Sequence, residues 1–97
     1  MTWQIEAVTN YQTCRDLRRV VFIEEQGVSE ADELDDMDEK AVHLLATQEG
    51  TPLGTARLLA KGDTGKIGRV CVLKEARGSG LGAALIKASV AHFETQP

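Results

Sequence analysis

The sequence predicts a single α+β domain over residues 1–97, an α/β fold with a mixed, largely antiparallel sheet flanked by helices. Three observations predict it. Apolar and polar residues alternate at residues 3–8, and apolar runs recur between residues 41 and 73, as in strands. Apolar residues spaced by three and four follow the first strand and close the chain, as in amphipathic helices. Short turns at residues 49–52 and 61–65 join the later strands into an antiparallel meander.

Composition and charge narrow the class of protein. The chain has 97 residues, of which 42% are hydrophobic and 27% are charged, which is typical of an ordinary globular domain. Neither a signal peptide nor an apolar run of membrane-spanning length is visible, so we expect a cytoplasmic protein without a membrane partner. The net charge of −4 argues against general nucleic-acid binding, because that requires clustered cations.

The first strand and helix follow from simple periodicity. Residues 3–8 alternate as a half-buried strand does, and Thr9 or Asn10 can cap the helix that follows. We expect Gly27 to end that helix. Its apolar stripe consists of Tyr11, Cys14, Leu17 and Val21, with the basic residues largely off it: Arg15, Arg18 and Arg19.

Three further strands are expected at residues 41–47, 53–60 and 66–73. His43 lies within the first of them, where a packed, hydrogen-bonded histidine is more common than a catalytic base. Gly68 lies inside the third strand and suggests a β-bulge or a close backbone approach. The last strand leads directly into the most informative stretch of the chain.

That stretch is a strand, a glycine loop and a helix that starts near Leu81 and ends near Phe93. Glycines occupy positions 78, 80 and 82. The first amides of a helix have no intrahelical partner and carry partial positive charge, so an anion can bind there. Glycines let a phosphate approach this backbone, and Arg77 adds a planar cation. We interpret the loop as a phosphate-binding site.

Two other phosphate loops do not fit. A Walker loop needs Lys followed by Ser or Thr after its last glycine, whereas Ala83 and Ala84 follow Gly82. A Rossmann loop has the spacing G-x-G-x-x-G and lies early in a βαβ unit. Here the spacing is G-x-G-x-G, and the loop comes last.

The segment from Arg77 to Gly82 resembles the acetyl-CoA motif of the GNAT superfamily of N-acyltransferases, which is Arg or Gln, two residues, Gly, one residue, and then Gly or Ala. Residues 69–73 resemble the family's fourth strand, and residues 28–38 and 54–58 resemble a small bacterial subgroup. The resemblance implies an acetyl-CoA site in which strand backbone contacts the pantetheine arm and the acyl carbonyl. The residues implied are Val70, Cys71, Val72, Arg77, Gly78, Ser79, Gly80, Leu81 and Gly82.

The resemblance also implies the reaction, transfer of an acetyl group from acetyl-CoA to a primary amine of a small molecule or peptide, with general base and acid unassigned. Relatives in this family continue with a further strand, a helix and a hairpin, so the domain is expected to be partial and C-terminally truncated. The strand that would then form an open sheet edge leads us to expect a homodimer. The alternatives are an inactive CoA-binding or dimerisation module, and a fragment in which the glycines serve only a tight turn.

Two interpretations remain open for the role of several polar groups. Glu24 and Glu25 are either a solvated helix end or a carboxylate facing the acceptor amine. Residues 30–39 hold seven carboxylates, either as a solvated connector or as an acidic lip that attracts a cationic substrate. This stretch lacks the glycine of a calcium loop, and Cys14 and Cys71 lack metal spacing, so no metal is expected. Cys71 is expected to be an inert buried thiol, with a catalytic thiol as the alternative.

Overall fold

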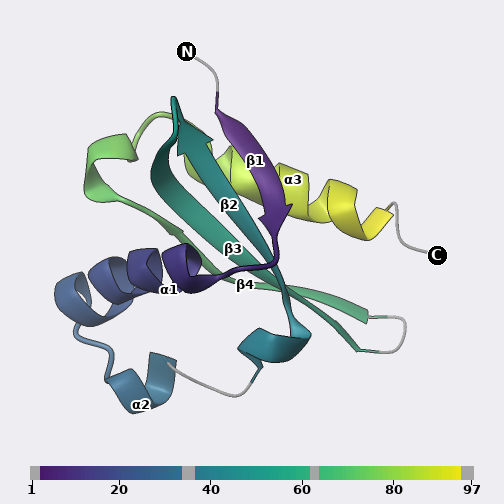
Figure 1. The fold of residues 1–97 in the computed structure, drawn as a ribbon, viewed down its shortest axis with the longest axis horizontal. Helices are drawn as coiled ribbons and strands as arrows, with labels where there is room; N and C mark the ends of the chain where they lie inside the picture. Colours follow the sequence, from purple (N-terminus) through teal and green to yellow (C-terminus); the bar gives the residue numbers. More distant parts are fainter. Residues whose placement is uncertain (1–2, 34–36, 62–63, 95–97) are drawn as a thin grey trace.

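The computed structural model of the protein describes residues 3–33, 37–61 and 64–94. Four strands form one antiparallel sheet whose order in space follows the order in the chain (Figure 1). The predicted strands are therefore confirmed, with bounds shifted by a few residues. They are β1 (Gln4–Val8), β2 (Val42–Gln48), β3 (Thr51–Lys61) and β4 (Thr64–Val72).

Helices cover both faces of the sheet. Helix α1 (Gln12–Arg18) packs on one face and α3 (Leu81–Glu94) on the other. Three short segments connect the elements: α2 (Glu30–Glu33) and two 3₁₀ turns, η2 (Asp38–Lys40) and η3 (Lys74–Ala76). Within the described ranges, no helix is long and apolar enough to cross a membrane.

The first helix changes its winding halfway. Residues Arg19–Glu25 form a π-helix, η1, in which the wider turn is visible as a bond from the Gln26 amide to the Val21 carbonyl oxygen at 3.2 Å. Gly27 then takes a φ of 72°, so the expected helix stop at Gly27 is confirmed. The wide turn places the end of η1, with Glu25, close to the end of β4.

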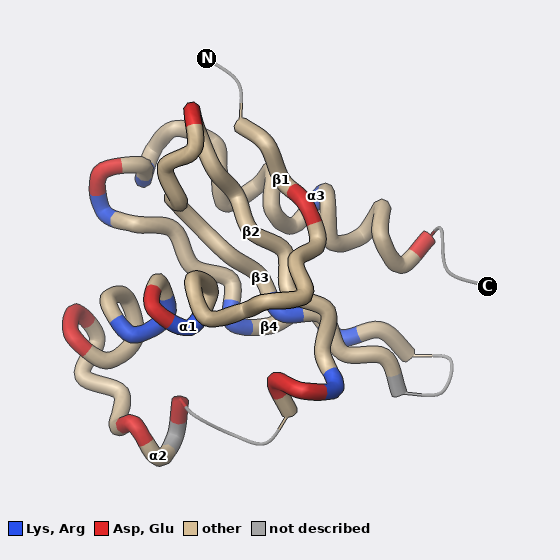
Figure 2. The backbone as a smooth tube through the Cα atoms, viewed as in Figure 1, with Lys and Arg blue, Asp and Glu red and all other residues tan. Residues whose placement is uncertain are grey.

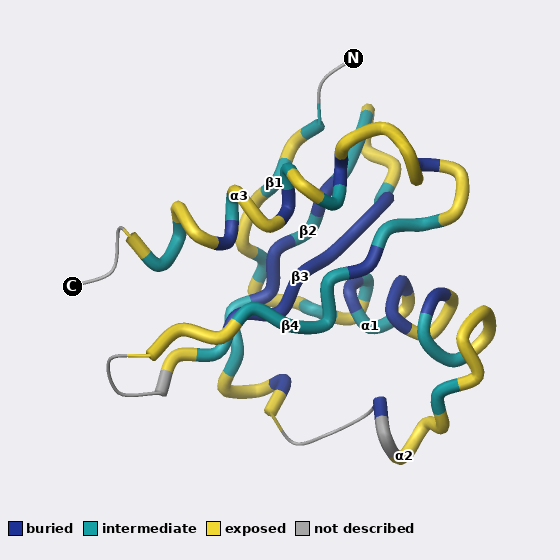
Figure 3. Tube along the Cα trace, turned by 180° about the vertical axis from the view of Figure 1, so that it is seen from behind, coloured by how far each residue is buried: buried dark blue, intermediate teal, exposed yellow. Residues whose placement is uncertain are grey.

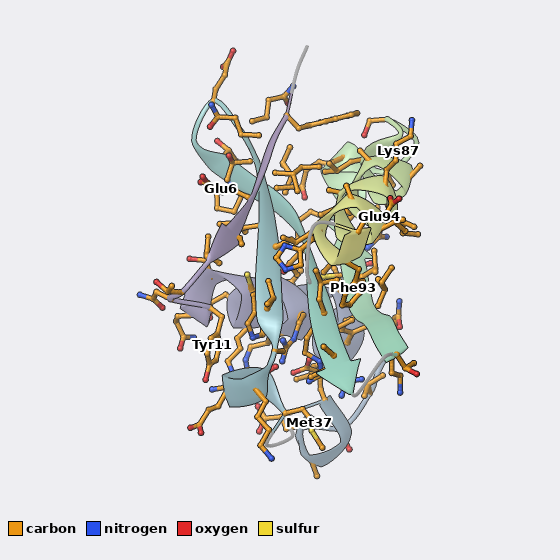
Figure 4. The ribbon with its side chains drawn as sticks, turned by 90° about the vertical axis from the view of Figure 1, so that its right-hand side faces the viewer. Glu6, Tyr11, Met37, Lys87, Phe93 and Glu94 are labelled. Atoms are coloured by element: carbon orange, nitrogen blue, oxygen red, sulfur yellow. The ribbon has the colours of Figure 1, made fainter. Side chains whose placement is uncertain are left out.

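Strand β3 runs through the middle of the core, where it is buried over most of its length (Figure 3). Leu58 from this strand belongs to the same buried cluster as Leu81 and Leu85 of α3. Gly54 permits this close packing, because a Cβ atom there would lie 2.9 Å from the Cys71 carbonyl oxygen and 3.0 Å from a Leu85 methyl group. At the far end, the Phe93 ring covers Gly65 at the β3–β4 hairpin (Figure 4).

Candidate functional site

The glycine loop connects η3 to the first turn of α3. Gly78 and Gly80 have φ angles of 82° and 92°, which only glycine adopts without strain. The Ala84 amide makes its helical bond to the Gly80 carbonyl oxygen at 3.0 Å, so the amides just before Ala84 begin the helix without an intrahelical acceptor. The predicted start of the helix after the glycine loop is therefore confirmed, and anion binding there stays a prediction.

Space remains above each of the three glycines. A Cβ atom would meet nothing within 4 Å at Gly78, and its nearest contact would be 3.9 Å away at Gly80 and at Gly82. Gly82 lies in α3, and its φ is not positive. Neither backbone conformation nor packing thus requires a glycine at position 82.

Arg77 connects the loop to two other elements. Its Nε donates to the Val72 carbonyl oxygen at 3.0 Å, at the end of β4. Its Nη2 lies 3.0 and 2.8 Å from the two carboxylate oxygens of Glu25, at the end of η1. The ion pair is partly exposed, so solvent screens it. The sequence indicated Arg77 as a phosphate ligand but gave no sign of this partner.

Strand β4 is the edge of the described sheet and carries a bulge. Thr55 pairs with Cys71 and Arg57 with Gly68, so Arg69 and Val70 together oppose Ala56. The expected bulge is present but begins one residue after Gly68, and Arg69 takes the positive φ of 50°. The register after the bulge decides which amides face the open edge.

The Leu73 amide donates to the Leu53 carbonyl oxygen at 2.8 Å, so it faces β3. Peptide directions alternate along a strand, which turns the N–H groups of Val70 and Val72 toward the open edge and that of Cys71 toward β3. The Cys71 side chain is buried, and this burial raises the pKa of its thiol to about 12. A thiol in that state is no nucleophile near neutral pH.

A cluster of buried charges lies on the α1 face of the sheet. The Arg18 guanidinium contacts Glu33 at 2.6 Å and Asp38 at 2.8 Å, and Arg15 and Arg57 contact Asp38 at 3.0 and 3.2 Å. Arg18, Glu33 and Asp38 are 1–2% exposed. In Figure 2, basic positions of α1 lie beside basic positions of β3 and β4.

Sequence analysis missed this cluster. Glu33 and Asp38 are neither a solvated connector nor an acidic lip, and Arg18 does not lie off the apolar stripe; both expectations were wrong for these residues. The signal was present, because Cys14, Leu17, Arg18 and Val21 follow the 3–4 spacing of one buried helix face. A buried cation on such a face requires a buried anion, and the nearest group of carboxylates in the sequence is in residues 30–39.

Asp38 is the most strongly perturbed carboxyl group of the cluster. Burial by itself would raise its pKa, but hydrogen bonds from Arg18 and Arg15 outweigh burial and hold the pKa of Asp38 well below its usual range. Hydrogen bonds to Asp38 and Glu33 raise the pKa of Arg18 despite its burial. Both side chains therefore stay charged near neutral pH.

His43 has a structural role, as expected. Its Nε2 lies 2.9 Å from the Asp38 carbonyl oxygen, and its ring stacks on Tyr11 with centroids 4.4 Å apart. Tyr11 stands at the start of α1 (Figure 4). Among the residues that the structure describes, no group of three or more His, Cys, Asp or Glu side chains is arranged to hold a metal ion.

A cavity of about 280 Å³ lies between η1, α2 and β4. Its wall is mainly apolar, with one ion pair at its edge: the Arg69 Nε lies 3.5 Å from a Glu33 carboxylate oxygen. The lining residues are Phe22, Val28, Glu33, Arg69 and Val70. Val70 thus connects the cavity to the open edge of β4.

Comparison with known proteins places this sheet, loop and helix among the acetyltransferases. The model described as the acetyltransferase (GNAT) family matches residues 11–96. The chain therefore belongs to the GNAT acetyltransferase family, and the fold class expected from the sequence is confirmed.

Individual relatives agree. A Bacillus subtilis protein named provisionally as an acetyltransferase is 39% identical over 88 residues, which are 88% of this chain and 60% of that protein. The crystal structure of a protein from Lactobacillus plantarum, named provisionally as an N-acetyltransferase, is 29% identical with a TM-score of 0.87, covering 97% of this chain and 68% of that one. An acyl-CoA N-acyltransferase from Pseudomonas aeruginosa is 30% identical with a TM-score of 0.79, covering 96% and 70%.

These relatives are longer than the chain. The chain spans 60% of the length of the first Bacillus subtilis relative and 49% of the length of YyaT, an uncharacterised protein from the same organism that is 48% identical over 73 residues. Statements on the activity of a whole protein containing this domain are therefore proposals.

Proposed function

We propose that this domain binds acetyl-CoA and takes part in transferring its acetyl group to a primary amine. In this reaction the amine nitrogen forms a bond to the carbonyl carbon, and the carbon–sulfur bond breaks. The ammonium group of the acceptor loses two protons before the amide is complete: one reaches the CoA thiolate, and the other passes through a general base or water to the solvent. The chain would contribute the donor site and one wall of the acceptor side.

Gly82 is the observation that carries the donor site. A turn that needs positive φ explains Gly78 and Gly80, but it does not explain Gly82, which has an ordinary φ and where a Cβ atom would make only an ordinary contact with Val72 at 3.9 Å. Glycine is also the poorer helix former by about 1 kcal/mol relative to alanine. A pyrophosphate resting on the amides at the start of α3 gives a reason for all three glycines. It also disfavours the interpretation of the loop as a turn without a ligand.

The edge of β4 supports the position of the thioester. The outward N–H groups of Val70 and Val72 lie on the same edge strand that leads into the loop. An N–H group aimed at a thioester carbonyl stabilises the negative charge that develops on its oxygen when the amine attacks. Cys71 would make no hydrogen bond of its own to the thioester, because its amide faces β3. Its role would be to connect Val70 and Val72 along the strand.

The acceptor side would be formed by η1 and the 280 Å³ cavity. Val70 lines this cavity, so an acceptor there would lie next to the thioester position. Glu25 pairs with Arg77 at the loop, and neither Glu24 nor Glu25 lines this cavity, so neither is assigned as the carboxylate near the acceptor amine. A mainly apolar wall favours an acceptor with an apolar part next to its amine.

The donor site is tested by calorimetric titration of the chain with acetyl-CoA and, in parallel, with S-acetylpantetheine, which has the thioester arm but no pyrophosphate. Each charge-assisted hydrogen bond contributes about 1.5–3 kcal/mol, so we expect acetyl-CoA to bind at least about tenfold more tightly. Equal affinities would contradict a pyrophosphate site on the loop. A mass-spectrometric screen of amines then tests transfer, and tight binding without transfer would favour an inactive CoA-binding module.

A further inference from the structure

The bulge in β4 is built on an unusual residue. The first position of such a bulge is ordinarily glycine when φ is positive, because a Cβ atom clashes with the following carbonyl group in this conformation. Here Arg69 holds a φ of 50°, although Gly68 is its immediate neighbour. Something outside the strand must therefore keep Arg69 in place.

Glu33 is placed to do this. The Arg69 Nη2 donates to the Glu33 backbone carbonyl oxygen at 3.2 Å, and its Nε lies 3.5 Å from the Glu33 carboxylate. Glu33 is in turn held by Arg18 at 2.6 Å and is 2% exposed. Arg18 is fixed by Asp38 in the buried cluster. A chain of charged contacts thus runs from the core of the α1 face to the bulge.

The position of the bulge has a direct consequence for the strand edge. One extra residue reverses the direction of every following peptide group relative to the sheet. With the bulge at Arg69, the Leu73 amide faces Leu53 and the amides of Val70 and Val72 face the open edge. Without it, the inward and outward amides would exchange places.

We propose that Glu33 is a positioning residue that holds Arg69 in the bulge and thereby aims the Val70 and Val72 amides at the open edge. A contact between these amides and the acyl carbonyl rests on the proposed function. The role of Glu33 and Arg69 in maintaining the register of β4 is independent of the proposed function.

The key experiment compares Arg69→Ala with Arg69→Gly. Alanine removes the contact to Glu33 but keeps the unfavourable positive φ, whereas glycine removes the same contact and relieves the φ. Because Arg69 is 28% exposed, we expect both variants to fold. The first readout is amide hydrogen exchange of Leu73 in the ligand-free chain, measured by NMR relative to the amides of β2.

We expect exchange at Leu73 to be about fivefold faster in Arg69→Ala and close to wild type in Arg69→Gly, because a lost hydrogen bond of about 1 kcal/mol changes an equilibrium by that factor. The affinity for acetyl-CoA should follow the same order. Equal exchange in the two variants, or unchanged exchange in Arg69→Ala, would overturn the proposal.

Glu33→Gln tests the partner, with Glu30→Gln as the matched control on the same helix. Glu30 is exposed and pairs with Arg19 at the surface, away from the cluster. We expect only Glu33→Gln to speed exchange at Leu73. If the wild-type chain does not bind acetyl-CoA, the proposed function fails while the exchange data still decide whether Glu33 and Arg69 maintain the register.

Discussion

At the residue scale, the buried cluster is the feature that most affects stability. Removing one partner of a buried ion pair leaves a charge without compensation and costs about 3–5 kcal/mol. Asp38 accepts contacts from three arginines, Arg15, Arg18 and Arg57, and is almost fully buried. It anchors η2 to the α1 face of the sheet.

Asp38→Asn should therefore lower the free energy of unfolding by about 3–5 kcal/mol at pH 7, as measured by urea denaturation. The exposed neighbour Glu39 supplies the control, because Glu39→Gln should change stability by less than about 0.5 kcal/mol. Equal effects of the two substitutions would contradict the role assigned to Asp38.

The same residue predicts a pH dependence. The pKa of Asp38 is lower in the folded chain than in the unfolded chain, so its contribution is fully present above the unfolded value of about 3.9 and is lost as the pH falls toward the folded value. Unfolding free energies between pH 7 and pH 3 should decrease below about pH 4 in the wild type and decrease less in Asp38→Asn. Parallel curves for the two proteins would count against this assignment.

Glu25 and Arg77 give a pair of predictions of opposite sign. Arg77→Ala removes the loop cation and should weaken acetyl-CoA binding by about tenfold. Glu25→Gln removes a carboxylate that holds the same guanidinium at 2.8 Å, so it should leave binding unchanged or strengthen it a few-fold. Calorimetry checks both, with the exposed Glu24→Gln as control. Weaker binding in both variants would show that the pair acts as a structural tie.

At the element scale, periodicity was sufficient to predict every strand and both long helices. Alternation found β1, and the 3–4 spacing of Leu81, Leu85 and Ala88 found α3. Three features of the structure could not be predicted from periodicity. A π-helix as short as η1 has no distinctive spacing of apolar residues in the sequence, so its residues were predicted as part of an ordinary α-helix. The positive φ lies on Arg69 and not on Gly68, and the burial of Glu33 depends on an arginine 15 residues away.

Two strand glycines test how closely the elements pack. Gly54→Ala would place a Cβ atom 2.9 Å from the Cys71 carbonyl oxygen, a backbone atom that cannot move freely, and should destabilise the fold by about 1–3 kcal/mol. Gly68→Ala has open space and an ordinary φ, so it should be neutral or stabilise by about 0.4–1 kcal/mol. Thermal unfolding of both variants measures the difference. A Gly54→Ala variant as stable as Gly68→Ala would contradict the packing.

At the scale of the whole molecule, the sheet has β1 and β4 as its two edges within the described ranges. Exposed strand edges favour pairing with a second copy. We therefore expect the chain of residues 1–97 to form dimers, seen by light scattering as a molar mass near twice the 10.5 kDa of one chain. A monomer at all concentrations up to about millimolar, the upper range in which exposed edges drive association, would contradict this expectation.

The sequence was enough to predict the glycine loop and the helix start, but not the tertiary contacts around them. Gly78, Gly80 and Gly82 form the expected helix start, because their spacing after a strand reflects local backbone requirements. Tertiary contacts determine the rest: Arg77 meets Glu25 from a segment 52 residues earlier, and Glu33 reaches Arg69 from 36 residues earlier. Local pattern carries no information on such pairs.

The most direct test of the donor site is a titration of Gly82→Glu with acetyl-CoA, together with its thermal unfolding. Glutamate is a better helix former than glycine and its charge is favourable in the first turn of a helix, so the variant should be as stable as the wild type or more stable by up to about 1 kcal/mol. Its carboxylate should nevertheless weaken acetyl-CoA binding by about tenfold or more, because it stands where the pyrophosphate would approach the amides. A stable Gly82→Glu chain that binds acetyl-CoA as tightly as the wild type would contradict a pyrophosphate site on the loop.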